Sequence, residues 1–182
     1  EDADALRDTI IVYASDHGEL GGAHGFSGKY MGYEEDLHVP LYVFHPDLPA
    51  RNVREMVSNV SIAPTIAALA GTQWPNRVPG RDLSKRLTGT EGPRDDAIFS
   101  ESETHVNLGL YRNVRATRMV RTRQYKYSYS FYDVQDGQLY DLEADPYEMN
   151  NLFHDAAHKG LRREMEERLR AWQKETDDYL EI

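Results

Sequence analysis

The 182-residue sequence contains no cysteine, which excludes a disulfide framework, a thiolate metal site and a cysteine nucleophile within this chain. It also has no apolar run approaching the roughly 20 residues that a membrane-spanning helix needs. Basic residues are outnumbered, with 21 Lys and Arg against 31 Asp and Glu and a formal net charge of −10. Since binding to a phosphate backbone depends on Lys and Arg, we do not expect nucleic acid as a partner. The lack of a long apolar run leads us to expect no membrane either.

The first half of the sequence has the pattern of an α/β fold. Continuous apolar runs at 9–14 and 40–44 predict strands buried on both faces, as in a parallel sheet covered by helices. A helix is predicted to start at Ser61, as its N-cap, and to stop at Gly71. We therefore expect residues 1–96 to be the C-terminal portion of a parallel α/β domain.

The second half, residues 97–182, has a different pattern. Short aromatic or β-branched segments between turn residues predict a small antiparallel sheet, with strands at 97–100, 116–121, 125–130 and 138–142. A C-terminal helix is predicted over 156–176, because one stripe carries Leu161, Met165, Leu169 and Trp172. Five arginines are expected to be solvated charges on strand faces: Arg112, Arg115, Arg118, Arg121 and Arg123. The expected fold class is α/β, α+β overall.

Asp16 and His17 follow the first predicted strand directly, at the strand end where α/β sheets place their ligands. A carboxylate oxygen beside an imidazole nitrogen offers half of a divalent-cation site. The alternative interpretation is a helix-capping aspartate beside a packed histidine. On the residues alone, both interpretations stay open.

Lys29 closes a glycine-rich loop that begins at Gly18. A flexible ammonium beside a cation site can hold a tetrahedral oxyanion as a point charge. His24, in the same loop, can donate a second hydrogen bond or a proton near neutral pH. The alternatives are a solvated lysine and a packed loop histidine.

Short motifs that resemble one protein family occur in a fixed order along the chain. They are Ser15-Asp16-His17-Gly18-Glu19, Ala23-His24-Gly25, Gly28-Lys29, Tyr33-Glu34-Glu35, His38-Val39-Pro40-Leu41, Ile62-Ala63-Pro64-Thr65, Leu69-Ala70-Gly71, Gly80-Arg81-Asp82-Leu83, Tyr125-Lys126-Tyr127, Leu139-Tyr140-Asp141-Leu142, Asp145-Pro146 and Glu148-Met149-Asn150-Asn151-Leu152. In this order they resemble the second half of the sulfatase family, within the alkaline phosphatase superfamily of metal-dependent hydrolases. The resemblance places residues 1–96 in the sulfatase catalytic domain and 97–182 in a small antiparallel-sheet subdomain with a C-terminal helix.

The resemblance also implies roles for the candidate site residues. Asp16 and His17 look like the pair that ligates the active-site cation, usually Ca²⁺, and Lys29 looks like the lysine that contacts the sulfate group. His24 lies where some members place a histidine that faces the substrate. For the neighbouring residues Glu19, Tyr33 and Glu34 we expect structural roles, as a helix-start carboxylate and as packing around the loop.

One part of the sulfatase pattern is missing from this chain. Sulfatases form their nucleophile, formylglycine, from a Cys or Ser in a Cys/Ser-x-Pro-x-Arg motif, and no such motif is present. We therefore expect the partner of this chain to be a missing N-terminal half, and we expect the chain alone to be inactive and to associate with itself. The intact protein is expected to be a sulfuric ester hydrolase acting on a sulfated small molecule or carbohydrate.

Two other functions are compatible with the same motifs. One is a phosphonate monoester or phosphodiester hydrolase of the same superfamily, with Mn²⁺ as its cation. The other is a catalytically silent sulfatase-like module, which would have no affinity for the cation even with the rest of the protein present.

Overall fold

The computed structural model describes residues 3–29, 31–75, 78–90, 95–108, 111–131 and 137–180. The chain divides into two compact units. The first consists of residues 1–18 and 37–95, and the second of residues 19–36 and 96–182. Segment 19–36, which carries the glycine-rich loop, therefore groups with the second half of the sequence rather than with its immediate neighbours. No helix among the described residues is long and apolar enough to cross a membrane.

The first unit contains a short 3₁₀ helix, η1 (Ala3–Asp8), and a two-stranded sheet. Strand β1 (Ile11–Ala14) pairs antiparallel with β2 (Leu41–Phe44). The expected parallel, doubly buried arrangement is therefore wrong for this pair, since Tyr13 and Tyr42 are 62% and 68% exposed. An apolar run predicts a strand but carries no information on the direction of its partner. The mixed α/β class itself is confirmed by the elements present.

The helix predicted after Ser61 is α2 (Ile62–Leu69), which follows the 3₁₀ turn η3 (Asn59–Ser61). Ser61 occupies the predicted N-cap position of α2, but it makes no capping hydrogen bond: its backbone angles are helical, and its hydroxyl accepts from the Arg81 N–H at 3.1 Å. Thr65 accepts from the Leu83 N–H at 3.0 Å. These two bonds hold α2 against the segment that leads into α3 (Ser84–Leu87).

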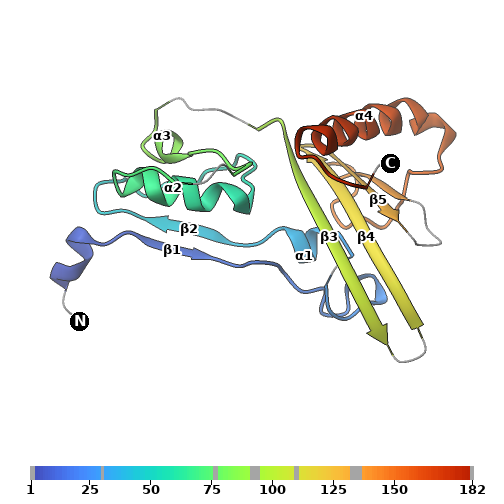
Figure 1. Ribbon diagram of the computed structural model, residues 1–182, viewed down its shortest axis with the longest axis horizontal. Coiled ribbons are helices and arrows are strands. Elements are labelled where there is room, and N and C mark those ends of the chain that lie inside the picture. The colour runs from blue at the N-terminus through green and yellow to red at the C-terminus, as the bar shows by residue number, and fades with distance from the viewer. Residues whose placement is uncertain are drawn as a thin grey trace. The chain divides into compact units, whose positions relative to one another are not determined.

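The second unit is built on a four-stranded antiparallel sheet, which confirms the small sheet predicted from the sequence. Its strands run in chain order: β3 (Ala97–Leu108), β4 (Tyr111–Thr122), β5 (Tyr125–Phe131) and β6 (Gly137–Asp141). The first two strands are longer than predicted and form the long hairpin seen in Figure 1. After the 3₁₀ turn η4 (Ala156–His158), helix α4 (Lys159–Glu175) packs on β4 and β5.

The face of the sheet under α4 holds the larger hydrophobic core. Its buried members are Val120, Tyr127, Leu139, Phe153, Met165 and Leu169. The predicted helix stripe is confirmed, because Leu161 and Trp172 pack against the same cluster. Gly137 opens β6 where the chain passes the ring of Phe153, and a Cβ there would lie 2.3 Å from that ring. The close contact explains why this position has no side chain.

The opposite face of the sheet is covered by segment 19–36. This segment contains the 3₁₀ turn η2 (Ala23–Gly25) and the start of helix α1 (Glu34–Leu37). Leu20 and Tyr33 are buried against Tyr140 of β6 in a second, smaller cluster. The expected packing role of Tyr33 is confirmed. Glu34 is the first residue of α1, whereas no helix begins at Glu19 among the described residues. Residues 125–127 alternate between the two faces, so that both Lys126 and Tyr127 are buried.

The prediction of solvated arginines is wrong for Arg121, which is 19% exposed and paired with Glu34, and most clearly for Arg118. Its side chain is 1% exposed and donates to Asp178 at 2.6 and 2.9 Å and to Glu103 at 3.0 Å. Asp178 follows α4, so this ion pair fastens the C-terminal end of the helix to β4. A guanidinium can be buried there because its donors meet two carboxylates in a fork geometry. The side chains of Arg112 and Arg115 lie outside the described residues.

Candidate functional site

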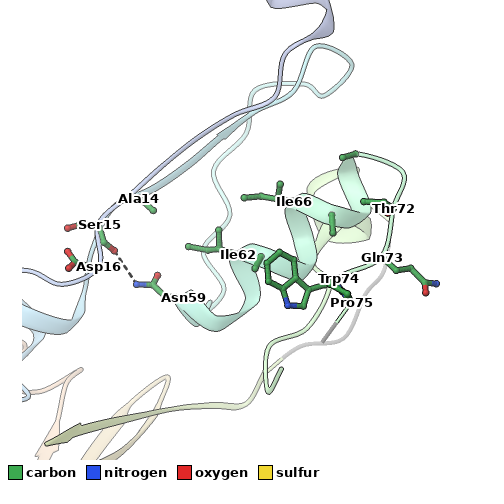
Figure 2. Close-up of a pocket in the computed structure, with 13 residues that line it drawn as sticks. Ala14, Ser15, Asp16, Asn59, Ile62, Ile66, Thr72, Gln73, Trp74 and Pro75 are labelled. Atoms are coloured by element: carbon green, nitrogen blue, oxygen red, sulfur yellow. Dashed lines mark hydrogen bonds between the residues drawn. The ribbon is translucent and has the colours of Figure 1, made fainter. Parts of the chain in front are cut away.

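The Asp16-His17 pair lies in a short turn after β1, in the first unit. Within this turn, the Ser15 hydroxyl donates to the His17 carbonyl at 2.7 Å, and Asp16 Oδ1 accepts from the His17 N–H at 3.0 Å. Asn59, at the start of η3, donates to the Ser15 carbonyl at 3.1 Å (Figure 2). These bonds fix the backbone of the turn from within and from the neighbouring helix.

The hydrogen bonds of His17 decide which of its ring nitrogens has a lone pair. Nδ1 lies 2.8 Å from the Gly18 carbonyl oxygen. Since a carbonyl only accepts hydrogen bonds, we assign the proton to Nδ1, which leaves the lone pair of a neutral ring on Nε2. This Nε2 lies 3.4 Å from Oδ2 of Asp16.

Two lone-pair atoms at this separation fit neighbouring ligands of one cation. With metal–ligand bonds of about 2.4 Å, they would subtend roughly a right angle at the ion. A protonated His17 would satisfy the same contact as an ion pair. The side chain of Asp16 is 85% exposed, so its oxygens are accessible to an ion. Because Ca²⁺ takes six to eight ligands, a Ca²⁺ site here would need further ligands from residues outside this turn.

Asp16 also borders an open groove of about 810 Å³ in the first unit. The groove runs along α2 and is lined mainly by apolar side chains, among them Ile62, Ile66 and Trp74 (Figure 2). Asp16 and Asn59 lie together at one end of it (Figure 2). The candidate cation ligands are therefore placed at the edge of an apolar depression.

Lys29 and His24 belong to the second unit, on segment 19–36. The backbone is fixed on both sides of Lys29. The Gly28 carbonyl accepts from the Leu20 N–H at 2.8 Å, and Asp36 Oδ2 accepts from the N–H groups of Met31 and Gly32 at 2.8 and 3.2 Å. Lys29 itself is half-buried. Its loop is thus held by a buried carboxylate of α1 rather than left to move with solvent.

His24 packs inside the same segment. Its ring stacks on Tyr33, with centroids 3.6 Å apart and planes within 6°, and its side chain is 8% exposed. Nε2 lies 3.5 Å from Oε2 of Glu35. The backbone of His24 is left-handed, with φ of 53°. These contacts fix the ring within the loop.

Four charged side chains attach segment 19–36 to the sheet, and the sequence patterns did not predict this network. Glu148 contacts the Lys126 ammonium, and both side chains are 1% exposed. The other oxygen of Glu148 accepts from the Glu34 N–H at 2.7 Å. The Glu34 carboxylate in turn receives two hydrogen bonds from Arg121, each 3.0 Å long. Burial raises the pKa of Glu148, and the nearby Lys126 opposes that shift.

Comparisons with known proteins identify what this arrangement is similar to. Residues 22–175 match the family described as N-sulphoglucosamine sulphohydrolase, C-terminal. An N-acetylglucosamine-6-O-sulfatase from Bacteroides thetaiotaomicron is 31% identical over 175 residues, which make up 95% of this chain and 31% of that protein. Mouse arylsulfatase K is 35% identical, over 82% of this chain and 28% of its own length.

Solved structures agree with these matches. The structure of BT1596, a 2-O GAG sulfatase, superposes with a TM-score of 0.83 at 26% identity, covering 94% of this chain and 37% of that one. The phosphonate monoester hydrolase of Agrobacterium radiobacter superposes with a TM-score of 0.81 at 30% identity, over 94% and 36%. The chain thus spans about a third of the length of the proteins it matches.

Proposed function

Because the chain belongs to the family described as N-sulphoglucosamine sulphohydrolase, C-terminal, we propose that the protein containing it hydrolyses sulfate esters of a carbohydrate. The family match covers most of the chain, and the relatives include sulfatases named for sulfated sugars. The chain would supply one side of the active site. A missing N-terminal half would supply the nucleophile, a formylglycine, together with the remaining cation ligands.

Asp16 and His17 are proposed as cation ligands, on the strength of one observation. Oδ2 of Asp16 and Nε2 of His17 lie 3.4 Å apart in a turn whose backbone accepts hydrogen bonds from Ser15 and Asn59. A divalent cation, Ca²⁺ in this proposal, supplies Lewis acidity and positive charge when bound there. The two residues bring one negative charge and one neutral nitrogen, which suits a divalent ion that also needs oxygen ligands from elsewhere.

Lys29 is proposed to bind the sulfate group of the substrate. Its ammonium is a compact charge on a flexible stem, on a loop whose backbone is fixed by Leu20 and Asp36. Charge at this place would stabilise the negative oxygens as the ester bond breaks. For His24, the stack on Tyr33 favours a role in holding the loop, and its role toward the substrate stays a prediction that the kinetics of His24→Ala would test.

The experiment replaces Asp16 and His17 singly by alanine in the whole enzyme. We expect hydrolysis of nitrophenyl sulfate to be lost and Ca²⁺ affinity, measured by calorimetric titration, to fall, with little change in melting temperature. Asp47→Ala is the matched control, an exposed aspartate of the same unit. Turnover and Ca²⁺ affinity close to those of the unsubstituted enzyme in either variant would refute the ligand assignment.

The second candidate is hydrolysis of phosphonate monoesters, with Mn²⁺ as the cation. It is favoured by the superposition on the phosphonate monoester hydrolase. The two functions differ in the ester that is hydrolysed faster, so the ratio of kcat/KM for nitrophenyl sulfate and a nitrophenyl phosphonate decides between them. A protein that binds no cation and hydrolyses neither ester would be the catalytically silent module.

A further inference from the structure

Glu148 is buried in a place where the sequence predicts exposure. Its two chain neighbours, Tyr147 and Met149, are 73% and 75% exposed, whereas Glu148 is 2% exposed. A glutamate buried between two exposed apolar residues reverses the usual preference of both residue types. Its backbone is also left-handed, with φ of 52°, a conformation that is costly for a residue with a long side chain. The surrounding structure holds Glu148 inward against these preferences.

His24, on segment 19–36, has the same left-handed backbone conformation as Glu148. Among the described residues other than glycine, three have positive φ, and two of these are His24 and Glu148. Their ligand atoms lie within 4.8 Å of one another, together with that of Glu35. Backbone strain of this kind gathers at functional sites more often than elsewhere. A cation is a poor occupant for this cluster, because Glu148 already contacts the Lys126 ammonium and the Glu34 N–H.

The ion pairs around Glu148 are better explained by positioning than by stability. Two carboxylates and two cations are present, since Lys126 also lies 3.7 Å from Glu34 Oε1 and Arg121 completes the set. A buried network of this kind adds little net stability over apolar packing, because each charge loses its hydration. The network instead favours a single position of segment 19–36 on the sheet, since any shift of the segment along the sheet would leave a buried charge unpaired.

A continuous chain of contacts leads from Glu148 to the Lys29 loop. Glu148 accepts from the Glu34 N–H and thereby fixes the first residue of α1. Two residues further along, Asp36 is 4% exposed, and its carboxylate accepts from the N–H groups of residues 31 and 32. These residues follow Lys29 closely in the chain. These contacts connect the carboxylate of Glu148, through α1, with the backbone that follows Lys29.

We propose that Glu148 is a positioning residue of the active site, which sets the place of the Lys29 ammonium through its contacts with Glu34 and Lys126. The proposal rests on the proposed function of Lys29 as the sulfate-binding residue. It assigns a purpose to the small antiparallel sheet: the sheet is the platform that holds the Lys29 loop. Glu148 does not touch the substrate, so its removal should matter only while Lys29 is present.

A double-mutant cycle in the whole enzyme tests this dependence. Glu148→Gln keeps an acceptor for the Glu34 N–H but removes the charge that faces Lys126. We expect kcat/KM to fall about 10-fold and the Kd for inorganic sulfate to rise by a similar factor, within the range by which residues of one network couple. In a Lys29→Ala background the same substitution should cost less than about 2-fold. Glu143→Gln, an exposed glutamate five residues away, should be neutral in both backgrounds.

The outcomes separate the two proposals. Equal losses from Glu148→Gln with and without Lys29 would overturn the positioning role, as would no loss in either background. If Glu148→Gln does not fold, Glu148→Asp, which keeps the charge and shortens the reach, takes its place in the same cycle. An unsubstituted enzyme without sulfatase activity would count against the proposed function alone, and the cycle on sulfate binding measured by calorimetry would still decide the role of Glu148.

Discussion

Replacing Asp178 by asparagine should lower the free energy of unfolding of the second unit by about 2 kcal/mol at pH 7. The hydrogen bonds from Arg118 lower the pKa of Asp178 from 3.8 to about 2, and Gln173 adds a further donor. Each pKa unit is worth about 1.4 kcal/mol, and the Asp178 side chain is only 3% exposed, so solvent screening takes little from this value. Arg118 keeps Glu103 as a partner in the variant, which limits the loss.

The pH dependence gives the sharper test. Because the pKa of Asp178 is lower in the folded state, its contribution is complete above about pH 4 and disappears as the pH falls toward 2. Urea unfolding followed by Trp172 fluorescence, in a Trp74→Phe background, reports on the second unit. Asp177→Asn is the matched control, since it makes the same change at the exposed neighbouring residue. The Arg118–Asp178 ion pair would be refuted as the source of this stability by either of two results: equal free energies of unfolding for Asp178→Asn and its parent at pH 7, or a difference between them that is unchanged at pH 2.5.

Three further predictions concern the active site and the core. In the whole enzyme, Lys29→Ala should lower kcat/KM for nitrophenyl sulfate by about 10²-fold or more, and Lys29→Arg should recover only part of the activity. Full activity in Lys29→Ala would refute the role of Lys29 in binding sulfate. This chain alone should show no turnover and at most weak Ca²⁺ binding by calorimetry, and micromolar affinity with turnover would contradict that. Gly137→Ala should lower the free energy of unfolding of the second unit, measured by urea unfolding, by about 1–3 kcal/mol, because the new methyl group would overlap the Phe153 ring. Gly160→Ala in α4 is the control, since a methyl group there meets open space and should not destabilise the unit. Equal effects of the two substitutions would exclude the steric explanation.

The sequence predicted the parts of the fold that local patterns determine. The stripe from Leu161 to Trp172 predicted α4, and the short alternating segments predicted the four-stranded sheet. Strand direction could not be predicted, because the apolar runs of β1 and β2 look the same whether their partner is parallel or antiparallel. The contact between segment 19–36 and the sheet was also out of reach, since it joins residues that are far apart in the chain.

The candidate site was predictable to a similar extent. The ordered motifs singled out Asp16, His17, His24 and Lys29, and the structure adds the hydrogen bonds that fix their backbones. The buried charges were missed because Arg118, Lys126 and Glu148 resemble surface charges in sequence. The one available signal was that Glu148 lies between two large apolar residues, Tyr147 and Met149. The usual expectation that charged residues are exposed predicts an exposed turn there, and so it missed the burial of Glu148.

The split origin of the second unit has a consequence for how the protein folds. The four strands follow one another in the chain, so the sheet can form from near neighbours, whereas the bond between Glu34 and Glu148 closes a loop of 114 residues. Long loops close late, so segment 19–36 should dock onto a sheet that already exists, and the same segment should be the first to detach. The loop that carries Lys29 would then be the last part of the unit to reach its folded position. Hydrogen exchange checks this order directly, since the amide of Glu34 should exchange well before that of Val120. Simultaneous exchange of the two amides would show that segment 19–36 and the sheet fold in one cooperative step.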